Sequence, residues 1–245
     1  NLEINLAGRY NDNSKYGNIF IPAYKLNYLL NDDNLFTIAI DKNFKNPAVF
    51  QTQISKFKSN ILLSPEILWK YEIGYKRNFS KNLKLNANIF KNIGKNRIDT
   101  TTTPFSNLNK TYTHRGYNLS LELLKNKFQT LVGYQYFYSS WDSRLQYRNK
   151  ITTANTYKIN DNLSLFLDSE YINKYYGSAN KQNRLPDFLL LNLALNYQVN
   201  KIISTRLSIN NLLDKKYSLM FDEQYGKGAI LMPDINLFFT ITAEL

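Results

Sequence analysis

The chain has 245 residues, of which 43% are hydrophobic and 15% aromatic, and it carries a formal net charge of +12. It contains no cysteine and one histidine, His114, which excludes disulfide frameworks, thiolate metal sites and multi-histidine metal sites. The lysines and arginines are scattered instead of forming a stripe, so the charge does not indicate nucleic-acid binding. No run of 18 apolar residues is present, which excludes a transmembrane helix.

Taken in chain order, the sequence predicts about twelve amphipathic strands, in which apolar and polar residues alternate. They are expected at 2–10, 19–30, 34–44, 66–79, 83–98, 112–124, 128–139, 145–159, 163–174, 187–199, 202–212 and 233–245. In the strand 187–199, Leu193 and Leu195 fall on one face, whereas Asn192 and Asn196 fall on the other. No amphipathic helix is expected between the strands.

The connections between these strands alternate in length. Short turns are expected at 31–33, 80–82, 125–127, 160–162 and 200–201, and longer segments at 11–18, 45–65, 99–111, 140–144, 175–186 and 213–232. Most of the latter are long, and 140–144 is the exception. All six prolines fall in the longer segments or at the start of a strand that leaves one, where a missing N–H group is tolerated. Short turns at one end and long loops at the other are typical of an outer-membrane barrel.

We therefore predict an all-β fold, namely a transmembrane up-and-down antiparallel β-barrel with about twelve strands present. Several expected strands exceed the roughly 9–11 tilted residues that cross a bilayer. Leu2, Ile4 and Leu6 already form a strand-like run at the beginning of the chain, without a preceding leader-like segment. We expect the chain to be a fragment or a processed product whose boundary cuts through a domain.

The four blocks 44–51 ("FKNPAVFQ"), 62–92, 114–122 ("HRGYNLSLE") and 206–217 ("RLSINNLLDKKY"), in this order and spacing, resemble the TonB-dependent outer-membrane receptor family. Residues 62–92 contain Pro-Glu after a long segment, then Y-E-x-G, a short turn and a strand that ends near Phe90. Residues 44–51 resemble that family's F-R-A-P segment, and 114–122 resemble its R-G-x-E-L-E strand. The block "RLSINNLLDKKY" at 206–217 resembles its N-L-x-D-K-x-Y ending of the penultimate strand. The sequence departs from the family pattern at Lys45, Asn46 and Asn118, and at the C-terminal Leu245, where an aromatic residue is usual.

The resemblance implies a receptor that takes up a scarce metal chelate across the cell outer membrane. The usual ligand is a ferric siderophore, and haem or cobalamin is less common. In the family, an N-terminal plug fills a barrel of about 22 strands, and a periplasmic TonB-type transducer drives uptake. On this basis residues 1–245 would be the C-terminal part of the barrel, without the plug, and would contact the lipid bilayer and the plug.

Catalysis has no support in the sequence, and no cofactor is expected. Glu66 and Glu72 are expected to line a polar lumen or to pair with nearby lysines, and His114 is expected to be a lumen or rim residue. Aromatic and basic residues in two long loops could hold an anionic, planar chelate by charge, stacking and cation–π contacts. The candidate ligand-binding residues are Tyr175, Tyr176, Arg184, Tyr217, Phe221 and Tyr225.

Two alternatives stay open at this point. A self-contained barrel of about twelve strands, acting as a pore or translocator, requires residues 2–10 to pair with residues 233–245. A soluble β-sandwich that binds a partner requires the apolar face from Leu189 to Val199 to be buried against other protein.

Overall fold

The computed structural model describes residues 1–53, 62–99, 104–140, 148–176, 184–222 and 228–244. The chain divides into two compact units. The first unit consists of Asn1–Tyr75, Asn88–Gly116 and Ser139–Trp141, and the second of Lys76–Ala87, Tyr117–Tyr138 and Asp142–Leu245.

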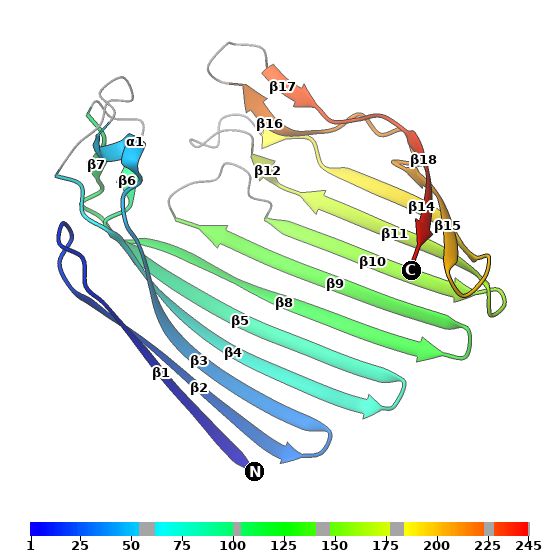
Figure 1. Cartoon of the computed structure of the whole chain (residues 1–245), viewed down its shortest axis with the longest axis horizontal. Helices are drawn as coiled ribbons and strands as arrows, with labels where there is room; N and C mark the ends of the chain where they lie inside the picture. Colours follow the sequence, from blue (N-terminus) through cyan, green and yellow to red (C-terminus); the bar gives the residue numbers. More distant parts are fainter. Residues whose placement is uncertain (54–61, 100–103, 141–147, 177–183, 223–227, 245) are drawn as a thin grey trace. The chain divides into compact units, whose positions relative to one another are not determined.

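Twelve long strands are joined in one sheet, in the order in which they follow one another along the chain (Figure 1). They are β1 (Leu2–Asn11), β2 (Ile19–Asn31), β3 (Asn34–Lys45), β4 (Glu66–Ser80), β5 (Leu83–Lys95), β8 (Tyr112–Lys125), β9 (Phe128–Ser139), β10 (Asn149–Lys158), β11 (Leu163–Asn173), β14 (Phe188–Gln198), β15 (Ile203–Asn210) and β18 (Asn236–Ala243). Their number, their positions and their meander order confirm the predicted all-β fold.

Several strands end earlier than the alternation predicts, because a residue with positive φ turns the backbone. Asn96 has φ 57° just after β5, Lys174 has φ 53° after β11, and Asn211 has φ 51° after β15. A left-handed residue does not continue a strand, so the predicted ends at 98, 174 and 212 move back to Lys95, Asn173 and Asn210. The predicted start of β10 at 145 lies outside the described residues.

The longer connections contain short elements that the sequence pattern does not predict. These are the helix α1 (Val49–Thr52) and the hairpins of β6 (Ile98–Asp99) with β7 (Ser106–Asn107), β12 (Tyr175–Tyr176) with β13 (Arg184–Leu185), and β16 (Ser218–Asp222) with β17 (Gly228–Leu231). Strands of two to five residues are too short to show a period of two. Within the described residues, α1 falls far short of the length and apolarity that a membrane-crossing helix needs.

Asparagine side chains close the short turns. The Oδ1 atom of Asn160 accepts hydrogen bonds from the backbone N–H groups of Asn162 and Leu163, both at 2.9 Å. Asn200 does the same for Ile202 and Ile203, both at 2.8 Å. Such Asx-turns explain why asparagine is abundant between the strands.

The first unit has one apolar and one polar sheet face. Pairing of β1 with β2 sets Ile4 opposite Leu26 on the apolar face, and pairing of β2 with β3 sets Leu26 opposite Ile38. On the polar face, Asn27 donates a hydrogen bond to Glu3 and accepts one from Thr37. The apolar side chains are exposed, as the 59% exposure of Ile4 illustrates.

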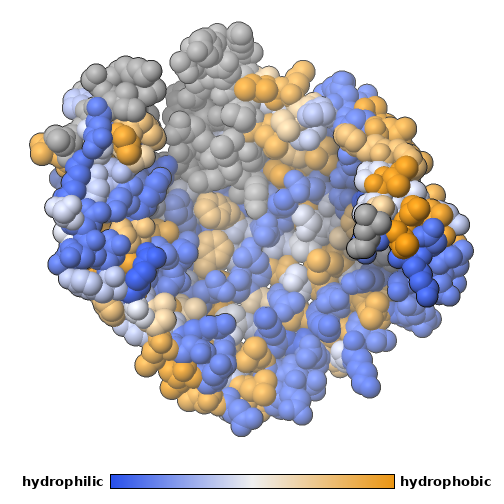
Figure 2. Space-filling view, in the orientation of Figure 1, coloured by the Kyte–Doolittle hydropathy of each residue, from blue (hydrophilic) through white to orange (hydrophobic). Residues whose placement is uncertain are grey.

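The second unit shows the same separation. Leu195 of β14 lies opposite Leu165 of β11 and Leu207 of β15 on the apolar face, and it is 37% exposed. On the polar face, Asn192 donates a hydrogen bond of 2.8 Å to Asp168. Hydrophilic residues cover much of the face in view in Figure 2, with hydrophobic side chains in separate patches between them.

A few polar side chains interrupt the apolar face of the second unit, and they satisfy one another. Thr130 donates a hydrogen bond of 3.0 Å to Asn155, and the hydroxyls of Thr153 and Ser169 are 2.9 Å apart. Paired polar groups cost far less in an apolar environment than unpaired ones, so this row is compatible with contact to lipid.

The burial and the strand order bear on the two alternatives. Leu189 and Tyr197 are 42% and 45% exposed, whereas a β-sandwich would bury them in its core. The strand order begins with β1 and ends with β18, so each has one neighbour in that order. In the part of the chain that the structure describes, this order does not contain the β1–β18 pairing that a self-contained twelve-strand barrel requires.

Candidate functional site

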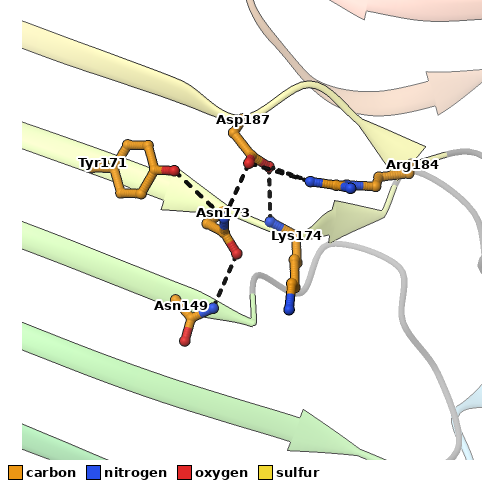
Figure 3. A network of polar contacts seen from close by, with 6 residues as sticks. All are labelled: Asn149, Tyr171, Asn173, Lys174, Arg184 and Asp187. Carbon is orange, nitrogen blue, oxygen red and sulfur yellow. Dashed lines mark hydrogen bonds and ion pairs between the residues drawn. The ribbon is translucent and has the colours of Figure 1, made fainter.

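The candidate site lies at the long-loop end of the second unit, where β11 passes into the β12–β13 hairpin. The backbone bends at Lys174, and Asp187 holds this bend from the start of β14 (Figure 3). The Asp187 carboxylate accepts a hydrogen bond of 3.0 Å from the Lys174 backbone N–H and another of 3.0 Å from the Asn173 amide. Asn173 in turn accepts a hydrogen bond from Asn149 of β10.

Arg184 of β13 completes this network. Its Nη2 atom lies 3.0 Å and 3.2 Å from the two carboxylate oxygens of Asp187. Burial alone would raise the pKa of Asp187, but hydrogen bonds from Lys174 and Asn173 and the neighbouring Arg184 guanidinium outweigh it and lower the pKa below its ordinary value. The carboxylate is therefore charged at neutral pH, and it ties the end of β11, the strand β13 and the start of β14 together.

A small apolar cluster lies beside this network. Ile172 of β11, Leu185 of β13 and Phe188 of β14 are each 3% exposed and form its centre. Tyr217 and Leu219, which precede and begin the β16 hairpin, pack against it, and the rings of Phe188 and Tyr217 are 4.7 Å apart. Burial raises the pKa of Tyr217, and the charge of Glu170 raises it further. The cluster thus joins the two loops that the sequence singles out.

The turn after β15 is organised by Asn211, which is only 4% exposed. Its side-chain amide donates hydrogen bonds to the carbonyls of Lys215 (3.0 Å) and Pro233 (3.3 Å), and its Oδ1 atom accepts one from the Lys215 N–H (2.9 Å). The Asn211 backbone N–H donates a hydrogen bond of 2.9 Å to the Oδ1 atom of Asn192, which lies on the polar face. Asp214 accepts a hydrogen bond from the Ile235 N–H at 3.1 Å. Residues 211–217 therefore shape the turn that delivers Tyr217 to the apolar cluster.

Below the cluster, the polar face carries paired charges and amides. Lys150 forms an ion pair with Glu170, and Arg206 donates a hydrogen bond of 2.8 Å to Asn196. The Arg206 guanidinium also lies 5.5 Å from the centre of the Phe166 ring. These contacts agree with the expectation that charged residues of the strands line a polar surface.

In the first unit, the predicted lumen residues Glu66 and Glu72 contact other protein groups. Glu66 accepts a hydrogen bond of 2.8 Å from the Ile98 N–H, and Glu72 accepts one of 3.3 Å from Asn88. The His114 ring lies edge-on to Tyr112, with ring centres 5.2 Å apart. In the part of the chain that the structure describes, no group of three or more His, Cys, Asp or Glu residues is placed to hold a metal ion.

Of the six predicted ligand-binding residues, the structure describes the side chains of three. Arg184 is 53% exposed and is engaged by Asp187, Tyr217 lies on the apolar cluster, and Tyr176 pairs with Arg184 in the β12–β13 ladder. Tyr175 and Phe221 are described as backbone only, and Tyr225 lies outside the described residues. Asp187 and Asn211 were not among the predicted residues, although Asp187 stands three residues after Arg184 and Asn211 falls in the block 206–217.

Comparisons with known proteins agree with this architecture. The family model "TonB dependent receptor-like, beta-barrel" matches residues 1–212. A curated relative, the probable TonB-dependent siderophore receptor PiuA of Acinetobacter baumannii, is 27% identical over 203 residues, covering 71% of this chain and 27% of that protein. The chain thus spans about a quarter of this relative's length.

Solved structures show the same fold. The ferric enterobactin receptor PfeA of Pseudomonas aeruginosa, solved as a mutant, matches with a TM-score of 0.82 and 16% identity over 99% of this chain and 42% of its own. The pyoverdine outer-membrane receptor FpvA of the same organism, bound to pyoverdine, matches with a TM-score of 0.76 and 21% identity over 100% of this chain and 40% of its own. Both likenesses extend over nearly the whole of this chain's fold.

Proposed function

This chain belongs to the family of TonB-dependent receptor-like β-barrels, and from that premise we propose that it forms wall and external loops of an outer-membrane receptor for a ferric siderophore. The observation that carries the proposal is the family match over residues 1–212, together with a relative of this barrel region that is named a probable siderophore receptor. The separated sheet faces support it, since exposed apolar side chains suit acyl chains and paired polar side chains suit an enclosed interior.

In this proposal the ligand is captured at the loop end of the second unit. Tyr176 and Tyr217 offer aromatic surface, and Arg184 offers a partly exposed guanidinium, which together suit an anionic chelate with planar rings. The Asp187 network and the apolar cluster position these groups. The full proposed set is Tyr175, Tyr176, Arg184, Tyr217, Phe221 and Tyr225.

We propose no catalytic activity for the chain. The ferric ion is part of the transported ligand and is not a cofactor of the protein. Residues 1–245 are proposed to be barrel only, with the plug and the contact to the TonB-type transducer contributed by other parts of the receptor. Haem is a less favoured ligand because the single histidine, His114, lies in the first unit against Tyr112 and not in the candidate site.

The test is uptake by cells that lack their own siderophore receptors and express the complete receptor containing this chain. Accumulation of radioactive iron is measured with catecholate, hydroxamate and mixed siderophores, with and without the transducer. We expect transducer-dependent accumulation with at least one class. Accumulation of haem or cobalamin alone, or uptake that persists without the transducer, would contradict the proposal.

A further inference from the structure

The apolar face of the first unit contains a groove of about 340 Å³ that crosses three strands. Ile38 and Ile40 of β3 line one side, Tyr71 and Ile73 of β4 line the floor, and Ile89 of β5 lines the other side, with Lys91 beside it. The polar side of the sheet shows which face the groove occupies. On that polar side, Asn88 of β5 donates a hydrogen bond to Glu72 of β4. Because side chains alternate, Ile73 and Ile89 fall on the other face, together with Lys91.

Four cations lie on this same apolar face, all toward the long-loop ends of their strands: Lys42, Lys91, Lys95 and Arg115. Lys42 follows Ile40 by two residues, and Lys91 follows Ile89 by two. Arg115 lies on this face because Tyr112, three residues before it, packs against Gly94 on the polar face. The Lys42 ammonium donates a hydrogen bond of 3.1 Å to the Phe20 carbonyl and lies 5.9 Å from the centre of the Trp69 ring. Cations thus lie next to an apolar groove. The Trp69 indole is on β4, the strand between β3 and β5.

Acidic residues are absent from this face among the described residues of the first unit's long strands. Each such acid lies on the polar face with a partner there: Glu3 with Asn27, Asp41 with Lys70, Glu66 with the Ile98 N–H, and Glu72 with Asn88. Lys91 has no ion-pair partner on the described part of this face. A positive charge on a lipid-facing surface is tolerated only near the membrane interface, where anionic headgroups attract it.

We propose that this groove and the cations Lys42, Lys91 and Arg115 beside it bind a phosphorylated lipid of the membrane leaflet on the long-loop side. One acyl chain lies in the groove between Ile38, Ile73 and Ile89. The lipid phosphate lies at Lys91, with Lys42 and Arg115 contributing to its attraction. The charge of the face and the apolar lining of the groove together select a ligand that is both anionic and acylated. This site differs from the proposed siderophore site in its residues, which belong to the first unit and lie on the apolar face of the sheet.

The test counts lipids bound to the complete receptor by native mass spectrometry, with dioleoyl phosphatidic acid and dioleoyl phosphatidylcholine as probes. We expect one phosphatidic acid to be retained in preference to phosphatidylcholine. The double variant K42Q/K91Q is expected to weaken that binding about 25-fold, since each cation near an anionic headgroup contributes roughly a factor of five. The matched control is K25Q, which removes the same kind of charge from the polar face, where Lys25 lies opposite Asn5 in the β1–β2 ladder.

A second variant distinguishes a specific lipid-binding site from non-specific electrostatic attraction. I73W fills the groove and leaves the cations, so it should reduce retention while the barrel still shows normal heat-dependent migration on gels. Equal retention by K42Q/K91Q and the unaltered receptor would overturn the proposal. It would also fail if K25Q lost as much binding as K42Q/K91Q, if I73W retained the lipid fully, or if inorganic phosphate alone displaced it.

Discussion

Replacing Asp187 by alanine should release the β12–β13 hairpin from the end of β11. The substitution removes the acceptor for the Lys174 N–H and the Asn173 amide, and each hydrogen bond contributes about 1 kcal/mol net. The ion pair with Arg184 adds only about 0.5 kcal/mol, because the Arg184 side chain is half exposed. The sum of roughly 2–3 kcal/mol corresponds to a hairpin that opens about 30- to 150-fold more often.

Amide hydrogen exchange of Lys174 and Leu185 in the complete receptor measures this opening. Asp161, an acid in a short turn at the opposite end of the strands, provides the control D161A. The pH dependence has a defined sign: the lowered pKa of Asp187 means that its contribution is complete above the ordinary carboxyl pKa, 3.8, and is lost as the pH falls through the folded value. Unaltered protection in D187A, or equal loss in D161A, would refute the reasoning.

Three further predictions concern the turn after β15, the polar face of the first unit and the apolar face of the second. N211A should lower the free energy of unfolding in detergent by about 3–5 kcal/mol, because three hydrogen bonds are lost and alanine is strained at φ 51°. N211G should recover about 1 kcal/mol of this loss, because glycine is not strained at that φ. An equal loss in both variants would argue against backbone strain. G94V should impair barrel assembly, measured by heat-dependent gel migration, because a Cβ at Gly94 would overlap the Tyr112 ring; Y112A should restore assembly, and failure to do so would place the strain elsewhere. L193K should destabilise the barrel by about 2–4 kcal/mol in lipid vesicles, whereas N192K, on the polar face, should cost far less; similar losses for both would contradict the assignment of the faces.

The long strands follow from the sequence because alternation is a local signal. The strand predicted at 128–139 coincides with β9, and the asparagines that mark the short turns close them through their own side chains. The ends of strands were less accurate, because positive φ at Asn96, Lys174 and Asn211 depends on partners distant in sequence. Lys174 in particular adopts this conformation where Asp187, thirteen residues later, binds its N–H group.

The candidate site could be anticipated only in part. The sequence indicated two loops rich in aromatic and basic residues, and the structure adds the cluster of Ile172, Leu185 and Phe188 that joins them. The block 206–217 was identified by its resemblance to a family motif. The structure adds a physical reason for that motif, because the Asn211 side chain forms the hydrogen bonds that fix this turn. Whether Arg184 and Tyr217 also contact a ligand stays a prediction.

The proposed receptor function requires that the apolar face of the sheet meets the acyl chains. Nitroxide labels at successive positions of β14, from 189 to 197, report this in vesicles through their accessibility to oxygen and to a water-soluble nickel complex, and the absence of cysteine from residues 1–245 simplifies the labelling. Labels at 189, 191, 193, 195 and 197 should be accessible to oxygen, with a depth that changes along the strand, and labels at the positions between them should be shielded from it. Equal accessibility along the strand, or oxygen access greater at 190, 192, 194 and 196, would contradict the account.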